Sequence, residues 1–444
     1  MRMRREILEM ITAALATLVA GLSLMLPSGF HWTSPTSVLQ LDMLAASQPR
    51  AVAAGSIIAL IVAVFATTVN HALAAWGAAL CGIAVLFATH LVSHFDAPAI
   101  APATLNYLDA LSGGILLGGI AVAVMRGWLQ VFGWTLGALS ATVFGQLGST
   151  SSGALRGGVT SPPGWSTNSL PPLWLIIVTL VLVATGTIVN RRLDTVERRS
   201  VELPMAPIVA GLIYLLTQLV GAQWLGRDAD SAGRIAAAVA LTVAAAVIAA
   251  LLLPRRDGVL ILLTVAGTTV GGALVPARLS VWAVAPLLLA IGIGLVAGFR
   301  RPAPMVAITM IGATSLYCAL FAQHRLDSNV HATILAGVLA LTGGYSFGSA
   351  APRYNPTRVF GVAVVFMPTV VATLRDHLSR PKCVIDPDYQ YLCPVPAQHV
   401  HAPYWAAVGT VAGCAVGLLA LRFWRRPGAS EAVPADGDSA VADI

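Results

Sequence analysis

One acidic residue stands out among the side chains that could do chemistry, because it lies inside an apolar segment. Asp109 is about one turn from the start of that segment, within residues 107–114. A carboxylate inside a bilayer is costly, so such residues usually bind a proton, a cation or a substrate. Alternatively, Asp109 lies at the membrane interface and caps the N-terminus of its helix, where the helix dipole favours negative charge. The sequence leaves both interpretations of Asp109 open.

The other polar candidates inside apolar segments carry no charge. A cavity lined by amide, hydroxyl and phenol groups would suit a neutral, lipophilic or amphipathic solute, because charged solutes usually need paired counter-charges. The candidates for such a lining are Tyr214, Gln218, Gln223, Thr268, Thr269, Tyr317 and Tyr345.

Two of the five cysteines lie close together in one polar, proline-flanked segment. Cys383 and Cys393 are ten positions apart, between the last two apolar segments. If this loop lies outside the cytoplasm, the spacing favours a local disulfide, with two free thiols as the alternative. The Asp and His residues nearby fit no recognised ligand spacing, so we expect neither a metal nor a cofactor. The cysteines inside apolar segments are interpreted as packing residues: Cys81, Cys318 and Cys414.

The elements that must position these residues are apolar segments that recur along almost the whole chain. Hydrophobic residues make up 57% and charged residues 10% of the sequence, and the mean hydropathy is +0.81. A helix needs about 20 apolar residues to cross a bilayer. The pattern therefore predicts an all-α, polytopic integral membrane protein with about 14 transmembrane helices. The predicted spans are 7–27, 51–69, 71–93, 106–125, 127–148, 170–190, 203–225, 235–253, 258–276, 280–298, 304–322, 331–350, 357–374 and 404–422.

The basic residues predict the orientation of these spans. With the N-terminus inside, 17 of the 26 Lys and Arg residues fall in cytoplasmic segments, as loops rich in Arg and Lys usually do. Both termini are therefore predicted to be cytoplasmic, and the net charge of +7 indicates no nucleic-acid partner. The first apolar segment is kept as a span, because it is long for a signal peptide and Leu26-Pro27-Ser28 is a poor cleavage site. Residues 428–444 are predicted to form a disordered cytoplasmic tail.

Glycines give the predicted spans small faces. Gly113 and Gly114 begin such a face in the fourth span, and the fifth span has Gly133 and Gly137. Small residues at this spacing let helix backbones approach closely in a membrane. They indicate either fixed packing or the sliding interfaces of a transporter.

The fourth and fifth predicted spans resemble those of the major facilitator superfamily, in particular its fourteen-span drug/proton antiporter branch. Residues 109–113 align with the family's Arg-x-x-Gln-Gly element, with Asp109 in place of Arg. Gly133 and Gly137 match the start of the family's fifth-span motif, whose proline and final glycines are missing here. The family's Asp-Arg loop after the second span is replaced by residues 68–72. The resemblance implies two six-helix bundles, 1–201 and 258–427, with two inserted helices in 202–257.

The resemblance also implies a function. We expect a secondary transporter that moves a lipophilic or amphipathic solute across the bacterial cytoplasmic membrane by alternating access, as in efflux, with Asp109 as the candidate for proton coupling. The missing motifs leave an alternative, a non-transporting membrane component of a cell-envelope or secretion assembly built on a degenerate transporter fold. An enzyme is not expected, because membrane glycosyltransferases usually carry paired acidic residues in the first external loop, where Asp42 stands alone.

Overall fold

The structure is a computed structural model, and the residues that it describes form helices almost throughout. It describes residues 2–25, 38–69, 71–94, 102–152, 171–190, 205–229, 231–254, 257–274, 281–325, 329–350, 352, 354–379, 384–385, 391–392 and 401–424. The predicted disordered tail, 428–444, lies outside these residues, as do Cys383 and Cys393.

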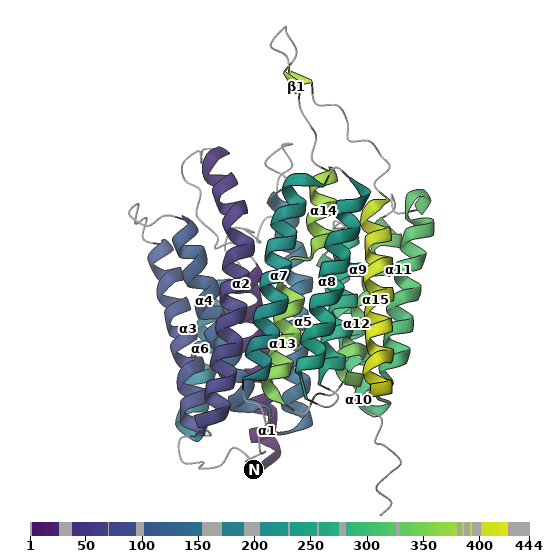
Figure 1. Ribbon diagram of the computed structural model, residues 1–444. Helices are drawn as coiled ribbons and strands as arrows, with labels where there is room; N and C mark the ends of the chain where they lie inside the picture. Colours follow the sequence, from purple (N-terminus) through teal and green to yellow (C-terminus); the bar gives the residue numbers. More distant parts are fainter. Residues whose placement is uncertain are drawn as a thin grey trace, which may run out of the picture.

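The helices run side by side in one bundle (Figure 1). They are α1 (Arg2–Met25), α2 (Val38–Val69), α3 (Ala72–His94), α4 (Pro102–Val124), α5 (Trp128–Ser152), α6 (Leu173–Asn190), α7 (Ala206–Asp228), α8 (Ala232–Leu252), α9 (Gly258–Ala273), α10 (Val281–Arg300), α11 (Pro304–Arg325), α12 (Asn329–Ala350), α13 (Asn355–Phe366), α14 (Val370–Ser379) and α15 (Ala402–Trp424). Strands β1 (Val384–Ile385) and β2 (Tyr391–Leu392) pair antiparallel, with Val384 opposite Leu392.

Each predicted span coincides with helical structure, and most of these helices are long enough to cross a membrane. Among the described residues, 12 helical stretches have the length and apolar composition of a span. The stretch Asn355–Leu378 covers α13 and α14 together. Two of the fourteen predicted spans are not among the 12: α9, which has only 16 residues, and α5. The chain is therefore a multi-pass integral membrane protein.

The outer surface of the bundle suits lipid. Large apolar side chains are exposed on many helices, for example Val416 on α15 at 66%. Exposed tryptophans lie at helix ends, where aromatic rings in membrane proteins usually meet the lipid headgroups: Trp128, Trp174, Trp282, Trp405 and Trp424. A helix that is apolar on all sides gains from burial in lipid as well as in protein.

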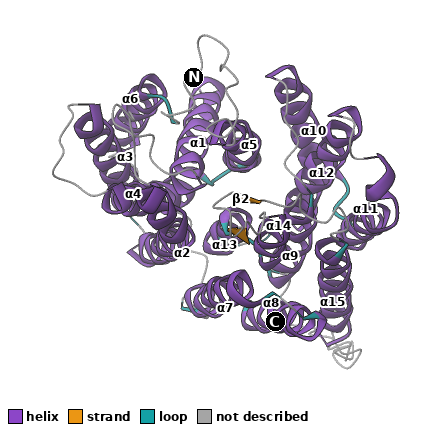
Figure 2. Ribbon diagram, turned by 90° about the horizontal axis from the view of Figure 1, so that it is seen from above, coloured by secondary structure: helices purple, strands orange, loops and turns teal. Residues whose placement is uncertain are grey.

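The helices form two groups of neighbours. Within α1–α6, α1 packs on α5, α2 on α4, and α3 on α4 and α6; among α9–α15, α9 packs on α13 and α15, α10 on α12, and α11 on α12 and α15. Helix α7 packs on α2, α8 and α14, and α8 also packs on α9 and α15. Seen from above, α13 lies near the middle of the bundle, and α7 and α8 lie along one edge (Figure 2).

Glycines bring the backbones of paired helices into close contact. A Cβ atom added at Gly114 of α4 would lie 2.8 Å from the carbonyl carbon of Gly55 in α2 and would overlap the carbonyl oxygen. At Gly344 of α12, the added atom would lie 3.1 Å from the carbonyl carbon of Ile291 in α10. Backbone contact at this distance needs a residue without a side chain, as the small faces in the sequence predicted.

The thirteenth predicted span, 357–374, is not one continuous helix. α13 ends at Phe366, α14 begins at Val370, and Met367 between them has extended backbone angles, φ −72° and ψ 130°. Pro368 explains the break, because proline has no N–H group to donate and disfavours helical angles at the residue before it. The prediction of a single helix here is wrong, although 355–378 still has the length of one span.

A polar cluster joins α1, α5 and α6 near the start of the chain. The Arg5 Nε atom lies 3.1 Å from Glu9 Oε1, and Gln130 donates to Glu9 Oε2 at 3.3 Å. Arg5 also donates to the Asn190 side chain. In the loop between α4 and α5, burial lowers the pKa of Arg126, an effect that Glu9 opposes. Glu9 therefore has a structural partner at the edge of the bundle.

Candidate functional site

Asp109 is buried between helices α3 and α4. Its residue is 3% exposed, and α4 begins at Pro102, two turns earlier. A residue in that position cannot be the N-terminal cap of α4, so the capping interpretation does not hold. The carboxylate instead meets the side chains of Thr89 and His90 on α3.

The hydroxyl of Thr89 can form a hydrogen bond with Asp109 in either protonation state. Its Oγ1 atom lies 2.5 Å from Asp109 Oδ1 and 2.9 Å from the carbonyl oxygen of Leu86. A hydroxyl has one hydrogen to donate. With Asp109 ionised, Thr89 donates to the carboxylate; with Asp109 protonated, the acid donates to Thr89, which then donates to Leu86. The carboxyl group keeps a hydrogen bond to Thr89 in both states.

His90 on α3 is a titratable residue beside Asp109. Its Nδ1 atom lies 3.1 Å from the carbonyl oxygen of Leu86 and 3.9 Å from Asp109 Oδ1, and the residue is 8% exposed. Since a carbonyl oxygen only accepts, Nδ1 carries the hydrogen. Nearer the start of α4, Asn106 donates to Gln48 of α2 at 2.7 Å.

A second polar site lies at the break between α13 and α14. Here a narrow crevice encloses about 190 Å³ of space between atoms, its open side included, and it is too narrow in this conformation to hold a water molecule. Five helices supply its walls, α7, α8, α9, α14 and α15. The lining residues are Gln218, Val239, Thr242, Thr269, Thr369, Val370, Val371 and Thr410.

Gln218 is the most unusual residue of this crevice. Its Nε2 atom donates to the Tyr214 hydroxyl at 3.0 Å, and the ring of Tyr214 packs edge-on against Phe360, with centroids 6.3 Å apart. Gln218 is 2% exposed, yet its Oε1 atom has no hydrogen-bond partner among the described residues. A buried carbonyl oxygen without a partner is costly, so its presence calls for a functional explanation.

The threonines of the crevice present oxygen lone pairs. Thr269 donates its hydrogen to the Val265 carbonyl at 2.6 Å, and Thr410 donates to the Ala406 carbonyl at 2.9 Å. Thr369 caps α14, because its Oγ1 atom accepts from the Ala372 N–H at 3.1 Å. Since these hydrogens are used within the helices, the oxygens of Thr269 and Thr410 remain available as acceptors.

The structure brings only some of the predicted polar residues together. Gln218 and Thr269 line the crevice, and Tyr214 is hydrogen-bonded to Gln218. Asp109 belongs to a separate cluster on α3 and α4.

The remaining predicted residues lie elsewhere. Thr268 bonds to the Thr264 carbonyl at 2.8 Å and does not line the crevice. Tyr317 is 40% exposed and its ring centroid lies 5.4 Å from that of Phe321. The Tyr345 hydroxyl donates to the Arg301 carbonyl at 3.0 Å, just after α10 ends.

Three lining threonines were missed in the sequence: Thr242, Thr369 and Thr410. Thr369 had a signal, because it follows Pro368 inside an apolar segment, and interrupted spans often form binding sites. Single threonines in apolar helices, such as Thr242 and Thr410, carry no such signal. Within the described chain no group of three His, Cys, Asp or Glu residues could hold a metal ion.

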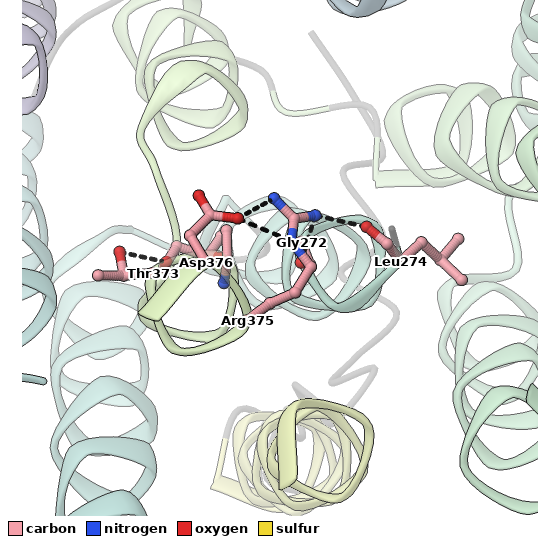
Figure 3. A network of polar contacts seen from close by, with 7 residues as sticks. Gly272, Leu274, Thr373, Arg375 and Asp376 are labelled. Carbon is pink, nitrogen blue, oxygen red and sulfur yellow. Dashed lines mark hydrogen bonds and ion pairs between the residues drawn. The ribbon is translucent and has the colours of Figure 1, made fainter. Parts of the chain in front are cut away.

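Polar side chains fasten the far end of α14 to its neighbours (Figure 3). The Arg375 guanidinium donates to the carbonyl oxygen of Gly272 at 3.0 Å and to that of Leu274, and pairs with Asp376 at 2.7 Å. His377 Nδ1 lies 2.9 Å from the Gly226 carbonyl. Carbonyls at helix C-termini lack partners within their own helix and carry partial negative charge. α14 therefore caps both α9 and α7.

Arg375→Ala should loosen α14. Hydrogen bonds to a charged group contribute about 1.5–3 kcal/mol, so we expect amide hydrogen exchange in 370–379 to accelerate by roughly tenfold or more. Asp376→Ala is the control, because the Asp376 side chain is 58% exposed and surface pairs contribute about 0–1 kcal/mol. Equal exchange rates in the two variants would show that Arg375 does not hold α14.

Comparisons with known proteins leave the family open. No protein-family model matches the sequence, and no curated protein matches it. Solved structures that are similar include the Major Facilitator Superfamily transporter FucP in its outward conformation, at 13% identity and TM-score 0.48, covering 94% of this chain and 98% of that one. An auto inhibited POT family peptide transporter has 13% identity and TM-score 0.46, with 98% and 99% covered. The xylose transporter XylE from E. coli has 12% identity and TM-score 0.47, with 94% and 96% covered.

Proposed function

We propose that this protein is a secondary transporter for a small, uncharged, lipophilic or amphipathic solute. The observation that carries the proposal is the break between α13 and α14, which faces a buried polar crevice containing Gln218. Interrupted spans are costly in a bilayer, and transporters use them to form binding sites near the middle of the membrane. Gln218 and Thr242 lie near the middle of α7 and α8, consistent with such a depth.

We further propose the division that the resemblance implies, with bundles 1–201 and 258–427 and the inserted helices in 202–257. The contacts between helices support this division, because the helix pairs that pack most extensively in the first bundle have counterparts in the second. The pairs α1–α5, α2–α4 and α3–α6 correspond to α9–α13, α10–α12 and α11–α15. The contacts between the groups also correspond, since α2 packs on α13 and α10 packs on α5. Rocking of two such bundles would give alternating access.

Asp109 is the proposed site of proton coupling. Its carboxyl group is buried beside His90 and keeps its hydrogen bond to Thr89 in both protonation states. A group that must gain and lose a proton during each cycle needs a site that tolerates both forms. This arrangement supports an exchange of protons for solute.

The proposed topology has fourteen crossings of a bacterial cytoplasmic membrane, with both termini inside and 375–403 outside. It can be tested in a variant whose five native cysteines are replaced. A membrane-impermeant maleimide applied to intact cells should label Gln398→Cys and spare Thr195→Cys, because the proposed topology puts residue 398 outside and residue 195 inside. Labelling of Thr195→Cys from outside would refute this topology.

Transport can be tested with the uncharged lipophilic dye N-phenyl-1-naphthylamine. Energised cells that produce the protein should hold less or more dye than cells with an empty vector, and a protonophore should remove the difference. Equal dye levels in the two strains would contradict transport of this solute class. That outcome would favour the alternative, a component of a cell-envelope or secretion assembly.

A further inference from the structure

The crevice at the α13–α14 break presents hydrogen-bond acceptors from three helices. Gln218 Oε1 is buried and has no partner among the described residues, so it can accept a hydrogen bond from a bound molecule. The hydroxyl groups of Thr269 and Thr410 already donate their hydrogens to carbonyls of their own helices, so only their oxygen lone pairs remain. A molecule in the crevice therefore meets these three groups as acceptors.

Another part of the lining is the start of a helix. Val370 and Val371, the first residues of α14, line the crevice beside the capping residue Thr369. The first N–H groups of a helix have no partner within the helix, and a helix N-terminus carries partial positive charge. The start of α14 therefore offers N–H donors to a bound molecule, whereas Gln218 offers an acceptor; the N–H of Ala372 is already bonded to Thr369 Oγ1.

The crevice does not suit a charged ligand. None of the described residues that line it carries an ionisable group, and three are valines. A charge placed there would lose its hydration without meeting a counter-charge. The best match is an uncharged group that both donates and accepts a hydrogen bond, attached to an apolar body that packs on Val239, Val370 and Val371.

We propose that the crevice binds the hydroxyl group of an amphipathic solute, which donates to Gln218 Oε1 and accepts from the first turn of α14. This inference rests on the proposed transport function and names the solute group that the site selects. Because the crevice is too narrow for a water molecule in this conformation, binding requires it to widen by a movement of α14. The residues between the two helices, 367–369, are the natural pivot, since no helix hydrogen-bond ladder crosses Pro368.

The test uses two fluorescent probes, 2-naphthol and its methyl ether, 2-methoxynaphthalene. They differ only in that the oxygen carries a hydrogen in the first and a methyl group in the second. Each is titrated into purified full-length protein in lipid nanodiscs. We expect wild type to bind 2-naphthol more tightly than the ether. Gln218→Leu should weaken 2-naphthol binding by roughly tenfold, about the value of one buried hydrogen bond, and leave the ether unchanged.

Gln223→Leu is the matched control, because it makes the same chemical change on α7 at a residue that does not line the crevice. Gln218→Leu removes a buried oxygen that lacks a partner, but it also removes the hydrogen bond from Gln218 Nε2 to the Tyr214 hydroxyl, so the melting temperatures of both variants are measured to check that they are folded. Equal affinity of wild type for both probes, or equal losses in the two variants, would overturn the proposed site. If the protein bound 2-naphthol selectively but moved no dye in cells, the proposed binding site would be supported and the proposed transport function would be contradicted.

Discussion

Gly114→Ala should destabilise the protein strongly, because the new methyl group has no room between α2 and α4. The added Cβ atom would lie 2.8 Å from the carbonyl carbon of Gly55 and overlap its oxygen. Both atoms belong to the backbone, so no side-chain rotation relieves the overlap and the two helices must separate. We expect a loss of about 3 kcal/mol or more, seen as a lower melting temperature of the detergent-solubilised protein.

Gly77→Ala on α3 is the matched control, because nothing lies within 4 Å of the position of its added Cβ. Alanine is the better helix former, so this variant should melt at the wild-type temperature or above it. Gly344→Ala repeats the test on α12, where the added atom would lie 3.1 Å from the Ile291 carbonyl carbon. If Gly114→Ala were as stable as Gly77→Ala, the close packing of α2 on α4 would be refuted.

The spans themselves could be predicted from sequence because the bilayer imposes a length and a composition on each of them. Both properties are local, so a run such as 235–253 is sufficient evidence for α8 (Ala232–Leu252). The break in 357–374 could not be predicted in the same way. Proline often only kinks a membrane helix. Whether it breaks the helix depends on distant partners, here the carbonyls of α9 and α7 that Arg375 and His377 bind.

The candidate site could be predicted only in part. The cost of a charge in a bilayer suggested a functional or a capping role for Asp109, and the structure buries it between α3 and α4. Its partners Thr89 and His90 depend on how α3 packs on α4, which the sequence pattern does not contain. Tyr317 was expected in a cavity but is exposed on α11. Helices that are apolar on every side give no signal for which face is internal, so such errors are expected.

Asp109→Asn should abolish proton-driven transport while leaving the protein folded. Asparagine can still accept the hydrogen bond from Thr89, which is 2.5 Å from the carboxylate in the wild type. It also removes a buried charge that is costly to desolvate, so the melting temperature should not fall. What asparagine cannot do is take up and release a proton. We therefore expect dye movement driven by an acid exterior to fall at least tenfold.

Glu9→Gln is the control for this prediction, because it makes the same chemical change at a carboxylate whose partners are Arg5 and Gln130 at the edge of the bundle. It should leave the dependence of transport on external pH unchanged. The two variants separate a role in coupling from a general effect of lost negative charge. If Asp109→Asn moved dye like the wild type across the pH range, Asp109 would be only a buried polar contact between α3 and α4. Transport would then depend on another ion or run downhill, and the hydrogen bonds that suit both protonation states would have no part in it.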